Sequence, residues 1–423
     1  MPRLSSLIMK ALTTAGAAVV SLAFAVDWTT ATQQAKLQSS DIQDSDYFGK
    51  DVSISGDGNT VIVGADLEDT GGSDAGAAYI FTRSGSTWTE QAKIQASDAQ
   101  AGDYFGIAVA LSNDGNTAIV GAHYEDTGGD NAGAAYIFTR SGSTWTEQAK
   151  IQSFEKQAGD AFGAAVALSN DGNTAIVGAP TEDTAGDNAG AAYAFVRSGT
   201  TWSSQGKLPQ YYPAAGDRFG TATALSGDGN TAIVSTWWKA GQEGTAYKLT
   251  RTGSTWAHAQ EFQFPGHTAN GFSRFGYACD ISSDGTTIVV SSVLGGTGGL
   301  VYIYTNTDSV LLQATLQSLD IEGNDNFGRD VSISSDGNTV VVGAIGEDDG
   351  AIAAVGAAYI FTRDGTTWTQ QKKLQHEGVR GSADFFGYSV AISDDSRTVI
   401  SGAYNVDTTG DNNAGAAYIL VAG

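Results

Sequence analysis

The amino-acid sequence predicts an all-β fold, a seven-bladed β-propeller made of four-stranded antiparallel blades. Three observations predict it: a seven-fold repeat, a series of four strand patterns within each copy, and a complement between the two ends of the chain. The repeat is marked by a Phe-Gly pair that recurs at intervals of 52 to 59 residues, beginning at Phe48, Phe105, Phe162, Phe219, Phe275, Phe327 and Phe386. A period of this length indicates a repeat architecture.

The second copy shows the four predicted strands. Residues 107–111 alternate in the manner of a strand, and residues 117–120 are apolar on both faces, which suits a strand covered on both sides. A third strand is expected at 134–140. The fourth, at 145–151, alternates apolar with polar residues, as an exposed edge strand does to resist pairing with other chains. Repeated seven times without helical periodicity, this pattern favours a propeller, with a linear solenoid as the alternative.

Each copy also carries turn signals between its strands. Asp114-Gly115 separates the first two strands, and we expect a tight two-residue hairpin there because such turns need positive φ angles. The pair recurs in five other copies, whereas the last copy has Asp395-Ser396. Polar residues 123–133 join strands two and three, and residues 141–143 turn the chain into strand four.

The two ends of the chain predict how the ring closes. The seventh copy stops after its third strand, residues 416–421. A segment that matches the missing fourth strand, Gln-Ala-Lys-Leu-Gln, occurs at residues 34–38. We therefore expect the N-terminal strand to pair beside the Tyr418 strand and complete blade seven.

The first 25 residues lie outside the repeats. Arg3 and Lys10 form a basic start, residues 11–25 carry no charge, and small residues surround Phe24. This layout is typical of a secretory signal peptide, and the uncharged run is short for a membrane span. We expect residues 1–25 to be removed, leaving residues 26–423 as one domain that is secreted, displayed at a cell surface or periplasmic. An uncleaved anchor is the alternative.

Charge and cysteine content narrow the functional classes. The formal net charge is -24, which argues against binding of nucleic acid or anionic lipid, since those surfaces are gripped through Lys and Arg. We expect no membrane insertion. Cys279 is the single cysteine, so no internal disulfide can form, and its apolar neighbours indicate a buried thiol.

The repeat resembles the FG-GAP repeat, the blade unit of integrin α-subunit propellers. Phe-Gly is present in all seven copies, and a later Gly-Ala is present in five, while copies four and five carry Ser235-Thr236 and Ser291-Ser292 instead. The resemblance implies a propeller whose family members bind Ca²⁺ in some blades through long Asp-rich loops between strands one and two. Here those loops shrink to Asp-Gly-Asn in most copies, too few oxygens for calcium. We therefore expect no cofactor, leaving weak Ca²⁺ binding by other acidic loops as the alternative.

Strand direction places the loops between strands two and three on the same face as the links between blades. The loops carry many acidic residues: Asp66, Glu68, Asp69, Asp74, Glu125, Asp126, Asp130, Glu182, Asp183, Asp187, Glu347, Asp348, Asp349, Asp407 and Asp411. The links add an Asp two residues before Phe in six copies: Asp46, Asp103, Asp160, Asp217, Asp325 and Asp384. We interpret the loops as a solvated acidic rim, with a surface for divalent cations or a cationic partner as the alternative, and the link Asp residues as turn or loop caps.

Blades four and five depart from the pattern on that face. Aromatic and cationic residues gather there, which suits stacking on sugars or anchoring a protein partner. The candidate ligand-binding residues are Tyr211, Tyr212, Arg218, Trp237, Trp238, Lys239, Phe272 and Arg274. The alternative is that the Trp residues fill space left by a shorter loop.

These observations predict a non-catalytic binding or adhesion module that presents a propeller face to a protein or glycan partner. A lectin-like protein and a divalent-cation-dependent surface scaffold are the alternatives. A hydrolase is the least favoured class, because the four His residues lie in different copies and no nucleophile, zinc or phosphate motif occurs.

Overall fold

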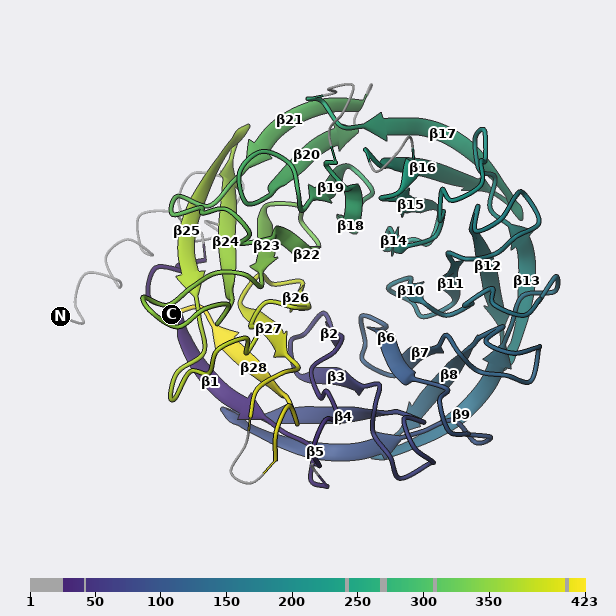
Figure 1. Cartoon of the computed structure of the whole chain (residues 1–423), viewed down its shortest axis with the longest axis horizontal. Helices are drawn as coiled ribbons and strands as arrows, with labels where there is room; N and C mark the ends of the chain where they lie inside the picture. The colour runs from purple at the N-terminus through teal and green to yellow at the C-terminus, as the bar shows by residue number, and fades with distance from the viewer. Residues whose placement is uncertain (1–25, 42, 240–242, 267–271, 307–309, 408–410) are drawn as a thin grey trace, which may run out of the picture.

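The computed structural model describes residues 26–423 apart from 42, 240–242, 267–271, 307–309 and 408–410. The predicted signal peptide therefore lies outside the described residues. Seven four-stranded antiparallel sheets form a ring (Figure 1), and residues of their innermost strands line a central channel. In six sheets the strands follow chain order from the centre outward, whereas in blade seven the outermost strand is the first strand of the chain. The predicted seven-bladed propeller is confirmed.

The strands form four concentric layers. The innermost strands are β2 (Val52–Ile54), β6 (Phe105–Leu111), β10 (Ala165–Leu168), β14 (Ala222–Leu225), β18 (Phe275–Ile281), β22 (Phe327–Ile333) and β26 (Val390–Ile392). The second strands are β3 (Thr60–Ala65), β7 (Thr117–Ala122), β11 (Thr174–Ala179), β15 (Thr231–Thr236), β19 (Thr287–Ser292), β23 (Thr339–Ala344) and β27 (Thr398–Ala403). The third strands are β4 (Ala77–Ser84), β8 (Ala134–Ser141), β12 (Ala191–Ser198), β16 (Thr245–Thr252), β20 (Leu300–Asn306), β24 (Ala357–Asp364) and β28 (Ala416–Val421). The outer strands are β5 (Thr87–Ile94), β9 (Thr144–Ile151), β13 (Thr201–Lys207), β17 (Thr255–Gln263), β21 (Val310–Leu316), β25 (Thr367–Leu374) and β1 (Thr32–Leu37).

The N-terminal strand closes the ring as predicted. β1 pairs antiparallel with β28, and Lys36 lies opposite Tyr418 in the register. The first and last strands therefore share blade seven, which Figure 1 shows as purple beside yellow. Trp28, just before β1, is fully buried in the hydrophobic cluster between blades six and seven. Burial of an indole next to the closing strand stabilises this closure, since aromatic side chains bury the largest apolar areas.

The Phe-Gly pairs form the contacts between blades. Phe105 is fully buried, with its ring edge-on to Tyr136 at a centroid distance of 5.5 Å. Gly106 has a φ of 97°, and a Cβ there would collide with the Ala77 carbonyl oxygen of the preceding blade. Phe thus fills the interface, and Gly permits the close approach of two backbones. Cys279 is buried and free, as the sequence predicts.

The Asp-Gly turns differ from the expected two-residue hairpins. β2 ends at Ile54 and β3 begins at Thr60, so the connection is longer. Gly58 has a φ of 66°, whereas Asp57 is not among the residues with positive φ. The Asp57 carboxylate instead accepts hydrogen bonds from the Ser55 hydroxyl at 2.6 Å and the Asn59 amide at 2.9 Å. The prediction of a two-residue turn is wrong because this side chain organises a wider loop.

The loops between the second and third strands lie on the same face of the ring as the links between blades, as predicted. The loop between β3 and β4 bonds to the link that enters blade two: the Gly102 amide donates to the Ser73 carbonyl and the Phe105 amide to the Ala75 carbonyl, both at 2.9 Å. We call this side, which holds the two–three loops and the interblade links, the loop face. Within the part of the chain that the structure describes, no helix has the length and apolar character needed to cross a lipid bilayer.

Candidate functional site

Many acidic residues of the loop face are internal. Glu125 is fully buried and lies 2.7 Å from the Lys150 ammonium, which also contacts Asp98 at 2.7 Å. The Tyr136 hydroxyl donates to the same Asp98 carboxylate at 2.8 Å. This network, which we call the lysine lock, ties the outer strand of blade two to its two–three loop and to the preceding link. Corresponding ion pairs involve Lys93 with Glu68, Lys207 with Glu182 and Lys373 with Glu347.

The expectation of a solvated acidic rim is therefore wrong for the buried Glu of each lock, and it is also wrong for Asp66, which is buried and lies 3.8 Å from the Lys50 ammonium. The buried Glu carboxylates have their charge neutralised within the protein, because an unpaired buried charge is strongly unfavourable. Other loop acids, including Asp69, Asp126 and Asp183, are exposed as expected. The sequence signal that was missed is the pairing of each Glu with a Lys about 25 residues later, at a fixed position of the outer strand.

The link Asp residues are buried loop caps. The Asp103 carboxylate accepts the Gln100 amide at 2.8 Å, and Asp46 accepts the Gln43 amide at the same distance. This confirms the predicted cap. Burial raises the pKa of Asp46 to about 7 and that of Asp103 to about 6. Among the described residues, no group of three or more His, Cys, Asp or Glu side chains is arranged to hold a metal ion.

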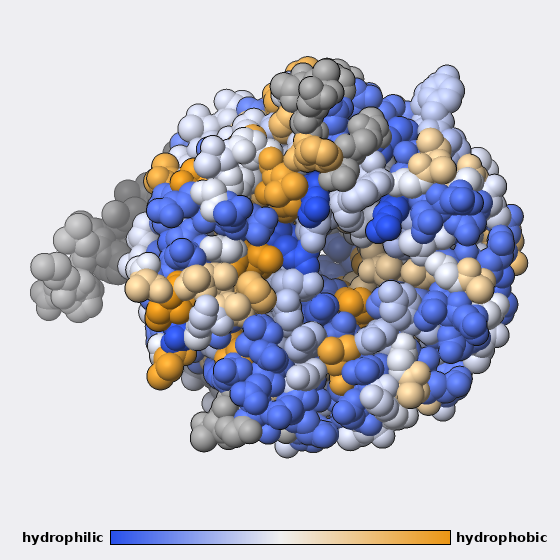
Figure 2. All heavy atoms as spheres, viewed as in Figure 1, coloured by the Kyte–Doolittle hydropathy of each residue, from blue (hydrophilic) through white to orange (hydrophobic). Residues whose placement is uncertain are grey.

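The central channel opens on the loop face, and we call this opening the mouth. The residues that line the mouth differ between its two sides. The residue after each Phe-Gly pair lines it, giving a ring of Lys50, Ile107, Ala164, Thr221, Tyr277, Arg329 and Tyr388. Blades two, three and four contribute small or aliphatic side chains. Blades five, six, seven and one contribute Tyr, Arg, Tyr and Lys, so aromatic rings alternate with cations on one side only. Figure 2 shows the channel as a hollow at the centre of the molecule.

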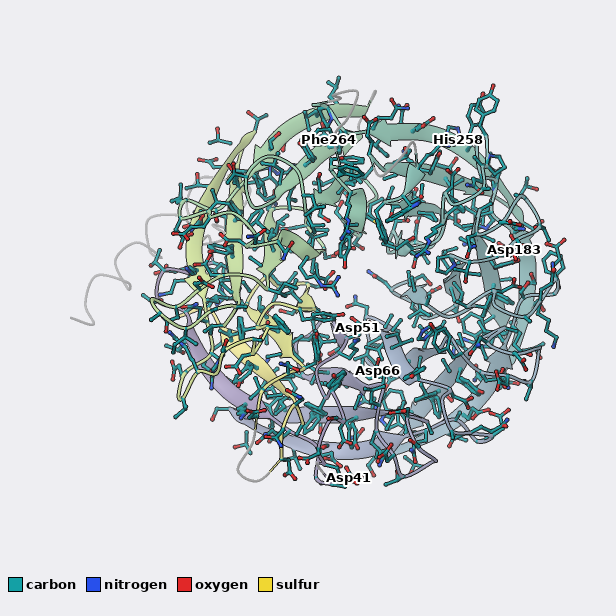
Figure 3. All side chains as sticks on the ribbon, in the orientation of Figure 1. Asp41, Asp51, Asp66, Asp183, His258 and Phe264 are labelled. Atoms are coloured by element: carbon teal, nitrogen blue, oxygen red, sulfur yellow. The ribbon has the colours of Figure 1, made fainter. Side chains whose placement is uncertain are left out.

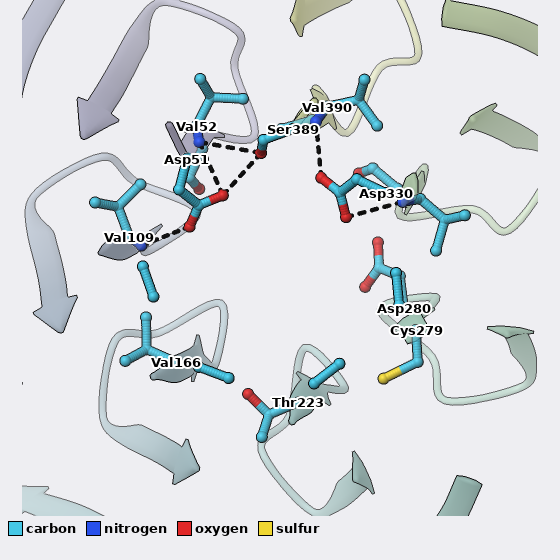
Figure 4. A pocket seen from close by; sticks show the side chains of 18 of the residues that line it. Asp51, Val52, Val109, Val166, Thr223, Cys279, Asp280, Asp330, Ser389 and Val390 are labelled. Carbon is cyan, nitrogen blue, oxygen red and sulfur yellow. Dashed lines mark hydrogen bonds between the residues drawn. The ribbon is translucent and has the colours of Figure 1, made fainter. Parts of the chain in front are cut away.

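One layer deeper, three carboxylates join the innermost strands (Figure 4). Asp51 accepts the Val109 amide of the next blade at 2.7 Å, and Asp280 accepts the Ile333 amide at 2.8 Å. Asp330 accepts the Val390 amide in the same way at 2.8 Å. Burial raises the pKa of Asp51 and of Asp280 to about 7. These three carboxylates form hydrogen bonds between neighbouring blades, so we assign them a structural role.

Four of the predicted site residues come together near the mouth. The rings of Trp237 and Trp238 meet edge-to-face at 4.7 Å between centroids. The Arg274 guanidinium lies 4.9 Å from the Trp237 ring, and that of Arg218 lies 5.6 Å from the Trp238 ring. Both indoles are half-buried. The cation–aromatic arrangement predicted for blades four and five is thus present as a geometric cluster.

The other predicted site residues are apart from this cluster. The Lys239 ammonium donates to the Tyr247 hydroxyl at 2.5 Å and to the Tyr211 carbonyl at 3.0 Å, so it holds blade four together. Tyr211 stacks on His258 of the outer strand, and Figure 3 shows His258 at the outer rim, far from Asp51 beside the channel. Tyr212 is 77% exposed and Phe272 is 60% exposed.

The indole pair continues into the mouth ring. Trp237 contacts Tyr277 with a centroid distance of 6.0 Å. The Arg329 guanidinium lies 5.0 Å from the Tyr277 ring and 3.9 Å from the Tyr388 ring, and its Nη1 bonds to the Tyr277 hydroxyl. Lys50 follows, 5.2 Å from the Tyr388 ring. We name the whole arc the mouth cluster: Trp238, Trp237, Arg274, Tyr277, Arg329, Tyr388 and Lys50. The sequence analysis did not identify its last four members, Tyr277, Arg329, Tyr388 and Lys50. Each of them directly follows a Phe-Gly pair, so an alignment of the seven copies on Phe-Gly would have grouped them.

Comparison with known proteins agrees with this geometry. The model of the FG-GAP repeat matches residues 31–81, 88–138, 145–195, 311–361 and 368–420, more than half of the chain. These matches cover the inner three strands of blades one, two, three, six and seven, and they omit those of blades four and five, where the indole pair lies. No curated protein sequence matches this chain. The chain belongs to the FG-GAP repeat family.

Proposed function

We propose that this protein is an exported, non-catalytic binding or adhesion module whose contact surface is the loop face of blades four and five. A propeller of this family supports a binding role, and the observation that carries the proposal is the indole pair with its two arginines. Trp237 and Trp238 supply apolar anchors, while Arg218 and Arg274 supply polar contacts around them. Trp and Arg dominate the energetics of protein interfaces.

The position of the indole pair argues for contact rather than packing. Trp237 and Trp238 are half-buried, and neither belongs to a hydrophobic cluster of the described residues. The other indoles serve packing: Trp145, for example, covers Arg140 and donates to Gln91 of the neighbouring outer strand at 2.9 Å. Aromatic surface that no core requires is a candidate for binding a partner.

The test is the double variant Trp237→Ala/Trp238→Ala in a screen against glycan arrays and surface proteins. Loss of two anchors should weaken binding at least a hundredfold, since a hot-spot residue contributes about 2 kcal/mol or more. The control is Phe154→Ala, which removes a 60% exposed aromatic residue from the link entering blade three. Unchanged binding, or a large loss of stability in the double variant, would assign the indoles to packing and overturn the proposal.

The screen also separates the kinds of partner. Release by a competing monosaccharide indicates a lectin, and binding that persists after sugars are removed from the target indicates a protein ligand. A melting temperature that rises with millimolar Ca²⁺ and falls with chelator indicates the cation-dependent scaffold. Turnover of a substrate by the isolated protein would replace the binding module with an enzyme.

A further inference from the structure

A small cavity opens beside the mouth cluster, between blades five and six. Its volume is about 250 Å³, and the polar side chains that line it are Arg274, Tyr277, Asn326, Arg329 and Tyr388. Aliphatic side chains complete the wall. Pockets for drug-sized ligands usually exceed about 300 Å³. This cavity therefore has room for one small ring or group.

Cationic donors converge on this cavity although the protein is strongly acidic. The Nε of Arg274 is buried and has no hydrogen-bond partner among the described residues. Arg329 lies between the rings of Tyr277 and Tyr388, which fix its planar guanidinium. A guanidinium has five N–H donors, so these ring contacts leave donors for a ligand.

The hydrogen bonds of the nearby carboxylates are made to groups other than the two arginines. Asp330 accepts backbone amides of Val331 and Val390, and Asp51 is bonded to Val109 and Ser389. Burial raises the pKa of both carboxylates. Asp66 is directed to Lys50, 3.8 Å away, rather than to either arginine.

We propose that this cavity binds a carboxylate-bearing sugar unit, a uronic acid residue of an acidic polysaccharide. This rests on the proposed binding function and specifies its ligand. The planar fork of an arginine matches the two oxygens of a carboxylate. The Tyr hydroxyls and the Asn326 amide provide donors and acceptors for sugar hydroxyls.

The geometry favours a sugar over an acidic peptide. Peptides recognised through their backbone need an exposed strand edge or an extended groove. The cavity is short, and side chains of blades five, six and seven line it. A single ring with a carboxylate uses the donors present without requiring a groove.

The test is isothermal titration of the full-length protein with trigalacturonate, with its fully methyl-esterified form, and with a hexaglutamate peptide. We expect trigalacturonate to bind with an affinity that falls as salt is added, and the ester and peptide to bind at least tenfold more weakly. The variant Arg274→Gln should lower the trigalacturonate affinity at least about tenfold, the loss typical of a hydrogen bond to a charged group. Arg274 is half-buried and its Nε has no hydrogen-bond partner among the described residues, so this variant should fold.

Two further variants control the result. Lys156→Gln removes the same charge from the exposed link that enters blade three, where its ammonium contacts Gln152, and should leave affinity unchanged. Arg329→Lys keeps the charge but loses the fork, and should weaken trigalacturonate binding. Absence of trigalacturonate binding at millimolar concentration, equal binding of the ester, tighter binding of hexaglutamate, or wild-type affinity in Arg274→Gln would each overturn the inference. If a partner found in the screen depends on the indole pair while trigalacturonate fails to bind, the proposed function stands and the uronate site is refuted.

Discussion

The lysine lock yields a stability prediction that can be worked from its contacts. The change is Lys150→Met, which keeps the length and apolar stem of the side chain and removes the ammonium. Lys150 is the cation that faces both Glu125 and Asp98. Glu125 is fully buried, whereas the Asp98 side chain is 39% exposed and can be solvated when the ammonium is lost. The loss in the free energy of unfolding therefore comes chiefly from Glu125, whose buried charge is left without a cation.

Removing one partner of a buried ion pair typically costs about 3–5 kcal/mol. After the change, Glu125 still accepts the Thr127 amide at 2.8 Å and the Gln152 side-chain amide at 2.8 Å. Because these two donors remain, we expect a loss at the lower limit of this range, about 3 kcal/mol in the free energy of unfolding.

Blade seven provides the matched control, Lys36→Met. Lys36 faces Tyr418 as Lys150 faces Tyr136, but Val406 occupies the position of the buried Glu. Burial lowers the pKa of Lys36, so its charged form is disfavoured in the folded protein. Its removal leaves no buried Glu unpaired, and we expect a change below about 1 kcal/mol, as for weak surface pairs.

Guanidinium unfolding followed by far-UV circular dichroism measures both variants against the unmodified chain. A Lys150→Met loss within 1 kcal/mol of the Lys36→Met loss would refute the reasoning, because the two changes differ chiefly in the buried Glu.

Two other predictions concern the blade contacts and pH. Gly106→Ala should destabilise the protein by more than about 1 kcal/mol, since alanine is strained at a φ of 97° and its Cβ meets the Ala77 carbonyl oxygen; Gly142→Ala, at a φ of 63° with open space around it, should cost less in the same unfolding assay. The raised pKa of Asp103 and of Asp51 means that the folded state holds protons that the unfolded state releases between about pH 4 and pH 7. Stability should therefore fall as the pH rises through this window, and calorimetric scans in which Asp103→Asn shows the same slope as the unmodified chain would contradict this origin.

The sequence was sufficient for the fold because each copy carries its own strand and turn signals. The Phe105-Gly106 register and the fit of residues 34–38 beside Tyr418 are local patterns that can be compared between copies. The turn length was not predictable in this way, since it depends on how the Asp57 carboxylate bonds to its neighbours.

The candidate site was predictable only in part. Trp237 and Arg274 stand out as departures from the repeat, and the structure brings them together. Lys239 was also expected to contact a ligand, but its ammonium donates a hydrogen bond to the Tyr247 hydroxyl of the same blade. The spacing of these residues in the sequence does not indicate this contact. Arg329 was missed because its neighbours in the ring, Tyr277 and Tyr388, come from two other copies.

The divergence of blades four and five follows from the same electrostatics as the lysine lock. Blade five has Gly295 at the position of the buried Glu and Thr315 at that of the Lys, so both members of the pair are absent. Blade four has Lys239 at the Glu position and Glu261 at the Lys position. Loss of the Lys alone would leave a buried Glu unpaired, whereas loss of the Glu alone, as at Val406 in blade seven, leaves no buried carboxylate without a cation. The buried Glu is therefore absent from both blades, and the residues before their Phe-Gly pairs, Arg218 and Arg274, lie against the indoles of the proposed contact surface.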